Sequence, residues 1–177
     1  MTDQAFTVRA ADWKADAPLL RPIRQAVFID EQRVPEELEW DELDIHCLHA
    51  LALDTSGTPI GCGRLTTDGK IGRMAVLAPW RKAGVGGAIL RFLIDEARRR
   101  GATECRLDAQ IEAVDFYHRH GFIAEGDEFL DANIRHRRMR LTLPGRREID
   151  SLAACRDAVT AVAAVARFDL TIFTHDL

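Results

Sequence analysis

Residues 71–100, which read IGRMAVLAPWRKAGVGGAILRFLIDEARRR, decide the fold of this chain. The apolar run at residues 71–77 is typical of a strand, and Pro79 ends it. A glycine-rich loop at residues 81–87 follows. From there apolar side chains recur with the period of a helix over residues 85–97. The stretch therefore predicts a strand, a glycine-rich loop and a long helix in direct succession.

The glycine-rich loop suits an anionic ligand. A helix N-terminus presents amide N–H groups without partners and a partial positive charge. Gly84, Gly86 and Gly87 allow a ligand close to this backbone. Arg81 and Lys82 add side-chain charge, so phosphate oxygens are the natural ligand. The Arg-x-x-Gly-x-Gly spacing matches neither the nucleoside-triphosphate loop nor the dinucleotide fingerprint. A turn that only packs the helix on a sheet is the alternative interpretation.

Upstream of this stretch, one helix and one charged segment are expected. The helix begins at Asp12 or Asp16 and extends toward Glu31, unless Pro22 starts or kinks it. A charged, irregular stretch then continues to His46. These residues lead into the first long strand of the chain.

The remaining elements form a sheet. Residues 48–53 and 60–65 flank the turn sequence DTSGTP, which predicts a β-hairpin. Further strands are expected at residues 6–9, 104–109, 122–129 and 138–143, with a short helix at residues 112–120. This order mixes a hairpin sheet with crossover helices, so the fold class is α/β or α+β.

Composition narrows the class of protein. The 177 residues, 47% hydrophobic and 29% charged, are typical of one globular domain with a small appendage. No apolar stretch approaches the roughly 20 residues of a membrane-spanning helix. Residues 1–4 (MTDQ) lack the basic start of a signal peptide. We therefore predict a cytoplasmic protein, away from membranes, with reduced and widely spaced thiols at Cys47, Cys62, Cys105 and Cys155.

The net charge of −4 comes from one segment. Between residues 30 and 44, eight carboxylates accompany one arginine. Such a run is either a solvated loop or a field that attracts a cationic substrate. The chain has no basic stripe, so nucleic acid is not an expected partner.

A second chemical motif lies at residues 113–122, which read AVDFYHRHGF. Tyr117 is the one tyrosine of the chain. Its phenol is a donor that supplies a proton to a leaving group. The alternative is an aromatic core residue whose hydroxyl is satisfied internally.

Over residues 6–143 these motifs, in this order, resemble the GCN5-related N-acetyltransferase (GNAT) family. The resemblance implies a mixed, mostly antiparallel central sheet that is splayed at the acetyl-CoA site and flanked by helices. It implies acetyl-CoA as cosubstrate and a small-molecule or peptide primary amine as acceptor, which attacks the thioester directly. Tyr117 would protonate the CoA thiolate, and Gln110 stands where an asparagine often contacts the pantetheine arm. The cofactor-binding residues that it implies are the strand backbone of Met74, Ala75 and Val76 and the loop residues Arg81, Lys82, Ala83, Gly84, Val85, Gly86 and Gly87.

A narrower resemblance is to the small bacterial acetyltransferases of the ElaA type. These carry a V-F-x-x-E-Q-x-x-P segment, which residues 27–35 match as VFIDEQRVP. Residues 44–50 (DIHCLHA) and 107–110 (LDAQ) also resemble their counterparts.

The sequence does not identify one residue as the general base that removes the proton of the acceptor amine. Many family members place a glutamate on the strand before the loop, but Arg73 and its neighbours supply no acid here. Glu31 is the first candidate and Asp108 the second, although Glu31 equally suits a solvated helix end. The acidic residues 36–44 are a further means of guiding the amine. A non-catalytic acyl-CoA sensor or scaffold is therefore the alternative function, and an unrelated phosphate binder is a third.

The histidine pair His46 and His49, and the tryptophan Trp40, each have two competing interpretations. His46 and His49 form an H-x-x-H, but on a strand their side chains point to opposite faces. With Asp44 as the one obvious further ligand, no metal site is expected. Trp40 lies within the acidic segment and either packs or lines an amine pocket.

Residues 1–145 are the predicted acetyltransferase domain, and residues 146–177 are a predicted helix–strand extension. The apolar strand at residues 168–173 would pair with another chain. We therefore expect the extension to mediate homodimer formation or to begin a truncated second module.

Overall fold

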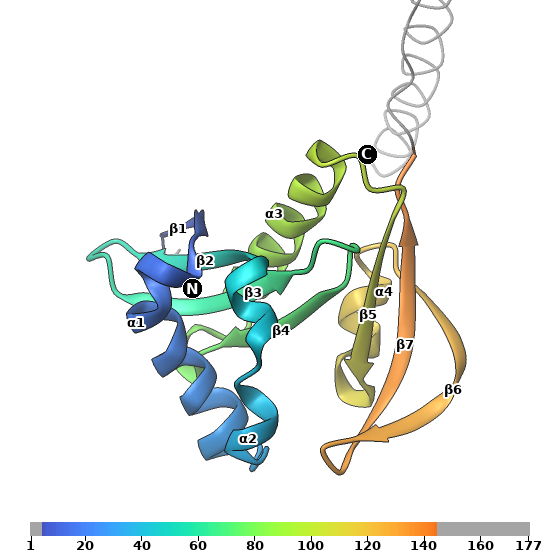
Figure 1. Cartoon of the computed structure of the whole chain (residues 1–177), viewed down its shortest axis with the longest axis horizontal. Helices are drawn as coiled ribbons and strands as arrows, with labels where there is room; N and C mark the ends of the chain where they lie inside the picture. Colours follow the sequence, from blue (N-terminus) through green and yellow to red (C-terminus); the bar gives the residue numbers. More distant parts are fainter. Residues whose placement is uncertain (1–4, 145–177) are drawn as a thin grey trace, which may run out of the picture. The chain divides into compact units, whose positions relative to one another are not determined.

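The computed structural model describes residues 5–144. The predicted extension at residues 146–177, and the dimer contact assigned to it, lie outside the described residues. The helices and strands follow in this order (Figure 1): β1 (Phe6–Ala11), α1 (Trp13–Arg24), the π-helix η1 (Gln25–Glu31), α2 (Glu36–Glu39), the 3₁₀ helix η2 (Glu42–His46), β2 (Leu48–Asp54), β3 (Pro59–Leu65), β4 (Ile71–Val76), η3 (Ala78–Trp80), α3 (Val85–Arg99), β5 (Glu104–Gln110), η4 (Ile111–Ala113), α4 (Val114–His118), β6 (Ile123–Asp131) and β7 (Ile134–Thr142).

The described strands form two antiparallel sheets. One has the order β1-β2-β3-β4 and the other the order β5-β7-β6. Between β4 and β5, the one bridge that the described residues form is a parallel pairing of Lys70 with Arg106. From there the two strands diverge (Figure 1). This confirms the predicted splayed sheet and the predicted hairpin, which β2 and β3 form.

The two faces of the first sheet pack on different helices. Successive side chains on a strand point to opposite faces. On β2, Ala50 and Ala52 therefore belong to the core formed with α3, while Leu51 belongs to the core formed with α1. The glycine-rich stretch thus produces a helix that buries one whole face of the sheet.

Glycines on β3 bring α3 close to the sheet. A Cβ atom on Gly63 would lie 2.7 Å from Met74 Sδ, and 2.9 Å from both Ile89 Cγ2 and Leu93 Cδ1. Ile89 and Leu93 are fully buried, so they have little room to move aside. The close packing of helix and sheet therefore depends on the missing side chain.

We expect Gly63→Ala to lower the free energy of unfolding by about 1–3 kcal/mol, because it overpacks this core. Urea denaturation monitored by circular dichroism measures the change. Gly72→Ala is the matched control, since a Cβ there meets no atom within 4 Å. A loss at Gly63 no larger than that at Gly72 would contradict the packing argument.

The N-terminal helix begins at Asp12, whose carboxylate accepts two backbone N–H bonds at 2.9 and 3.2 Å. This confirms one of the two predicted starts. Pro18 and Pro22 both lie inside α1, so of the two alternatives offered for Pro22, a helix start there is excluded. Instead the chain widens into the π-helix η1 directly afterwards, with a bond from Gln32 N–H to Val27 O at 3.2 Å. Proline removes one N–H donor from the helix, and a wider turn often follows such an interruption.

Candidate active site

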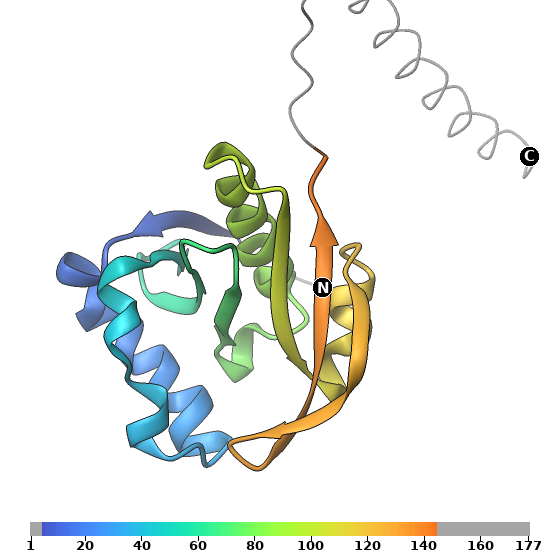
Figure 2. The same ribbon diagram turned by 45° about the vertical axis from the view of Figure 1, so that its right-hand side comes forward.

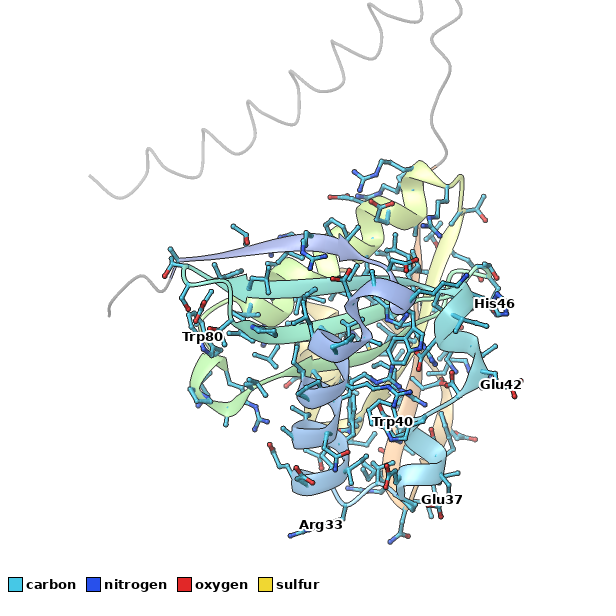
Figure 3. All side chains as sticks on the ribbon, turned by 60° about the vertical axis from the view of Figure 1, so that its left-hand side comes forward. Arg33, Glu37, Trp40, Glu42, His46 and Trp80 are labelled. Carbon is cyan, nitrogen blue, oxygen red and sulfur yellow. The ribbon has the colours of Figure 1, made fainter. Side chains whose placement is uncertain are left out.

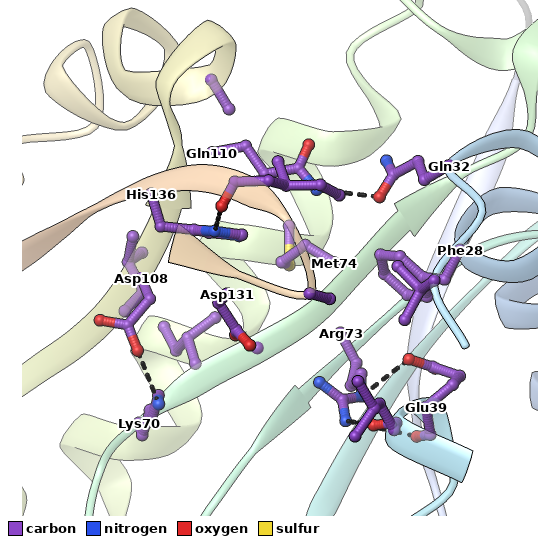
Figure 4. Close-up of a pocket in the computed structure, with 18 of the residues that line it drawn as sticks. Phe28, Gln32, Glu39, Lys70, Arg73, Met74, Asp108, Gln110, Asp131 and His136 are labelled. Carbon is purple, nitrogen blue, oxygen red and sulfur yellow. Dashed lines mark hydrogen bonds and ion pairs between the residues drawn. The ribbon is translucent and has the colours of Figure 1, made fainter. Parts of the chain in front are cut away.

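A cavity of about 220 Å³ opens where β4 and β5 separate. Residues of the loop after η1 and of the turn between β6 and β7 both line it. Figure 2 shows these two segments at the same end of the described fold. Its polar and charged lining residues are Tyr117 and the residues Gln32, Glu39, Lys70, Arg73, Asp108, Gln110, Asp131 and His136, which Figure 4 labels. The sequence predicted three of these as functional residues: Tyr117, Asp108 and Gln110.

Tyr117 reaches this cavity from α4. Only 9% of its surface is exposed, and its ring packs edge-on against Phe116 and Phe122, at centroid distances of 5.0 and 5.9 Å. Its hydroxyl has no hydrogen-bond partner among residues 5–144. Burial raises the pKa of Tyr117 to about 12, so the phenol carries its proton at neutral pH. The side chain therefore presents a protonated donor to the cavity.

The backbone of β4 borders the same cavity. Ala75 and Val76 pair with Cys62 and Gly61 of β3 on one side. On its other side β4 has no strand ladder within the described part of the chain. Arg73 adopts a left-handed backbone conformation with φ +51°, next to an irregularity in the β3–β4 register. Such a bulge ends regular pairing and re-aims nearby groups, so amide groups of β4 are open to a ligand.

The loop that follows β4 ends in an uncapped helix. Gly84 is the N-cap of α3 with φ +84°, a conformation that favours glycine, and no side chain caps the helix. The first helical bond runs from Ala88 N–H to Gly84 O at 3.0 Å. The amides of residues 85–87 therefore precede the helical ladder and suit an anion.

Each nitrogen of the Arg81 guanidinium has a hydrogen-bond partner in the protein. Its Nε donates to Val76 O at 3.0 Å, and its two Nη atoms bind the Glu31 carboxylate at 2.7 and 2.5 Å. This ion pair joins the loop to η1. It also lowers the pKa of Glu31, through the hydrogen bond from Arg81. Glu31 is not among the residues that line the cavity.

Asp108 and Gln110 do line the cavity, but both have partners. One oxygen of Asp108 lies 2.7 Å from Lys70 Nζ and the other 3.6 Å from Arg138 Nε. Gln110 Nε2 donates to Gln32 Oε1 at 2.8 Å. Gln32 belongs to the VFIDEQRVP segment, so this bond links that segment to β5. Gln110 is therefore an anchoring residue for the cavity wall in this structure.

The acidic segment is solvated only in part. Its residues form two short helices, α2 and η2, rather than the irregular stretch that was expected. Glu37 and Glu42 point outward (Figure 3). Three other carboxylates of this segment instead pair with arginines of three other elements: Glu39 with Arg24 and Arg73, Asp41 with Arg64 and Arg73, and Asp44 with Arg24 and Arg64. Because these charges balance one another, the expectation of a cation-attracting field is wrong for them.

The interior of this charge cluster is buried. Arg24, Glu39 and Asp44 are 1%, 2% and 0% exposed. Burial raises the pKa of Glu39, against the opposing effect of Arg24 and Arg73. Arg73 also binds the carbonyl oxygens of Leu38 and Glu39, at 3.1 and 3.3 Å. The cluster therefore fixes Arg73 of β4 in the cavity wall.

Trp40 and His49 pack around this cluster. The Trp40 ring lies against the guanidinium groups of Arg21 and Arg24, at 5.1 and 4.9 Å, and it does not line the cavity. The amine-pocket interpretation of Trp40 is therefore wrong. His49 Nε2 lies 2.9 Å from Asp44 O, and its ring stacks on Trp13 at 5.1 Å. Burial lowers the pKa of His49.

Residues 5–144 contain no group of three or more side chains arranged to hold a metal ion. None of the helices in this part of the chain is long and apolar enough to cross a membrane.

Comparison with known proteins gives the family. Residues 10–143 match the family model described as an acetyltransferase (GNAT) domain. The uncharacterized N-acetyltransferase YjcF of Bacillus subtilis (strain 168) is 42% identical over 121 residues, which are 66% of this chain and 86% of that protein. This chain belongs to the GNAT acetyltransferase family, as the sequence predicted.

Solved structures agree with this assignment. Escherichia coli ElaA aligns with a TM-score of 0.70 and 20% identity, over 77% of this chain and 99% of its own. An acyl-CoA N-acyltransferase from Pseudomonas aeruginosa aligns with a TM-score of 0.69 and 26% identity, over 78% of this chain and 100% of its own. Family membership supports acetyl-CoA-dependent acyl transfer as the general class of activity.

Proposed function

We propose that this protein transfers the acetyl group of acetyl-CoA to a primary amine by direct attack, with Tyr117 as the general acid. The observation that carries the proposal is the buried, protonated and unpartnered phenol of Tyr117 in the cavity beside the open edge of β4. The acceptor is a small molecule or a peptide, and the reaction takes place in the cytoplasm.

The residues present fit acetyl-CoA. Of the three β4 residues that the resemblance implies, Met74 and Val76 turn backbone groups to the open edge of β4, which suits the amide-rich pantetheine arm, whereas Ala75 pairs with Cys62 of β3. The uncapped amides of residues 85–87 and the exposed Lys82 suit the pyrophosphate of acetyl-CoA. Arg81 is already ion-paired with Glu31. We therefore assign Arg81 to holding the loop in place rather than to neutralising the charge of the pyrophosphate.

The bound thioester supplies an electrophilic carbonyl carbon and a thiolate leaving group. Tyr117 donates its proton to the departing sulfur, which avoids release of a free thiolate into the cavity. Amides at the opening between the sheets polarise the carbonyl. A separate group removes the proton of the acceptor ammonium.

Arg73 is the observation that favours the second candidate function, a non-catalytic acyl-CoA sensor or scaffold. It stands on β4 where an acid would serve as base, and it is tied into ion pairs. Calorimetric titration with acetyl-CoA, followed by thiol release over a panel of amines, separates the two functions. Binding with release on at least one amine supports the enzyme, whereas binding without release on any amine supports the sensor. Absence of binding contradicts both.

We expect Lys82→Gln to weaken the affinity for acetyl-CoA by about two- to fivefold, as is usual for one exposed ionic contact. The effect increases at low salt, because screening of exposed charges is weaker there. Calorimetry at two salt concentrations measures it. Lys14→Gln is the matched control, because Lys14 is an exposed lysine on α1 away from the loop. Equal effects of the two variants would contradict a phosphate contact at Lys82.

A further inference from the structure

His136 lies in the active-site cavity through the pairing of β5 with β7. In the register of these two strands, His136 lies directly opposite Gln110. Two residues further along the strands, on the same face of the sheet, Arg138 lies opposite Asp108. Side chains of directly opposed residues share one face of a sheet. The His136 ring accordingly lines the cavity together with Asp108 and Gln110 (Figure 4).

The hydrogen bond of His136 fixes its tautomer. Nδ1 lies 2.9 Å from the carbonyl oxygen of Ile134. A carbonyl oxygen only accepts, so Nδ1 carries the proton. In the neutral ring Nε2 then holds a lone pair, and no described residue donates to it. Stacking on Phe129, at a centroid distance of 6.0 Å and an angle of 26°, supports this ring orientation.

The other acids near the cavity are occupied. Both oxygens of Asp108 face cations, and both oxygens of Glu39 face Arg24 and Arg73. Glu31 lies outside the cavity lining and binds Arg81. Each of these carboxylates would lose an ion pair on accepting a proton.

Asp131 differs, because it forms no ion pair with any other described residue. The charged residues that line the cavity are the cations Lys70 and Arg73 and the carboxylates Glu39, Asp108 and Asp131, so negative charge exceeds positive charge by one among them. Tyr117 is a further titratable residue of the cavity lining, and its phenol is neutral. Proton uptake by the ring therefore meets no excess of positive charge, and Asp131 is free to attract an ammonium group.

We propose that Nε2 of His136 removes the proton from the acceptor ammonium, a role that rests on the proposed acetyltransferase function. Imidazole takes up and releases protons near neutral pH, which suits a general base. The ammonium gives one proton to Nε2, and the freed nitrogen pair forms the bond to the acetyl carbon as the carbon–sulfur bond breaks. The sulfur keeps the electron pair of the broken bond and takes the proton of Tyr117. The acylated nitrogen then loses its second proton, which water carries to the Tyr117 phenolate. The imidazolium of His136 releases its proton to solvent.

The first experiment needs no acceptor. Long-range nitrogen-15 spectra of the imidazole groups in the full chain identify the tautomer of each histidine, and His136→Gln assigns the signal of His136. We expect the neutral ring to carry its proton on Nδ1. A proton on Nε2 in the neutral ring would overturn the proposal, whether or not the protein is an enzyme.

The second experiment compares two classes of amine in thiol release from acetyl-CoA at pH 7. For an alkylamine, which is charged at this pH, His136→Gln lowers kcat/KM by about 10²-fold. For an arylamine or a hydrazide, which is already neutral, it changes kcat/KM by less than about threefold, since no proton has to be removed first. The loss on the alkylamine also shrinks as the pH rises toward 10.

Controls separate the proposal from its alternatives. His46→Gln replaces an exposed histidine on η2 and leaves both amines unaffected. Equal losses on both amines from His136→Gln would assign the residue a merely structural role and overturn the proposal. The proposal would also be overturned if Asp131→Asn lowered kcat/KM for the alkylamine alone while His136→Gln did not. Failure of the wild-type protein to bind acetyl-CoA in calorimetry would instead remove the proposed function itself.

Discussion

Replacing Tyr117 with phenylalanine is expected to lower kcat for thiol release from acetyl-CoA by about 10²- to 10⁴-fold, the usual contribution of a positioned general acid. The affinity for acetyl-CoA changes by less than about twofold, because the phenol acts on the departing sulfur rather than on the bound thioester. Initial-rate kinetics with any amine accepted by the wild-type protein measure kcat, and calorimetry measures the affinity.

Phenylalanine is a close control on structure at this position. The Tyr117 hydroxyl has no hydrogen-bond partner among the described residues, so its loss leaves no buried group unpaired. The packing of the ring on Phe116 and Phe122 is retained. We therefore expect the midpoint of thermal unfolding to stay the same, which separates a chemical effect from a folding defect.

The pH dependence gives a second check. Since burial raises the pKa of Tyr117 to about 12, the phenol remains protonated throughout assays between pH 6 and 10. Its ionisation therefore sets no alkaline limb within that range, and the wild-type and Tyr117→Phe profiles share one shape. An unchanged kcat in the variant would contradict the general-acid role, and an alkaline limb that only the wild-type protein shows would contradict the raised pKa.

Local sequence patterns predicted the parts of the fold that local physics determines. The hairpin of β2 and β3 follows from its turn residues, and the helix α3 follows from its apolar periodicity. The π-helix η1 was missed because its wider turns leave no distinct period in a seven-residue segment. The short helices of the acidic segment were missed because contacts with distant arginines hold them.

Some residues of the candidate site could likewise be predicted from local sequence patterns, and others could not. Tyr117 and the loop carry recognisable spacing, so they could be found from sequence. His136 was missed because β7 begins at Ile134, four residues before the expected strand, and its polar residues hide the alternation. The one available signal was the series Ile134, His136 and Arg138 at a spacing of two. The cluster of Arg24, Arg64 and Arg73 joins α1, β3 and β4, and no local pattern reveals such contacts.

Asp44→Asn is expected to lower the free energy of unfolding by about 3–5 kcal/mol, the usual cost of breaking a buried ion pair by removing one charge. One oxygen of Asp44 accepts from Nη1 of Arg24 and from Nη1 of Arg64, both at 2.8 Å, and the residue is 0% exposed. Asparagine has the same size but no charge, so the cluster keeps three arginines against two carboxylates. Urea denaturation measures the loss.

The control for this prediction comes from the same segment. Glu42→Gln removes an exposed carboxylate of η2, and its effect is expected to stay within about 0.5 kcal/mol. A loss below about 1 kcal/mol for Asp44→Asn would mean that water or movement of the arginines compensates the missing charge. Because Arg73 of the same cluster lines the cavity, the destabilised variant should also bind acetyl-CoA more weakly than Glu42→Gln does. An unaltered affinity, together with the full loss of stability, would instead show that the cluster supports the fold without positioning the cavity wall.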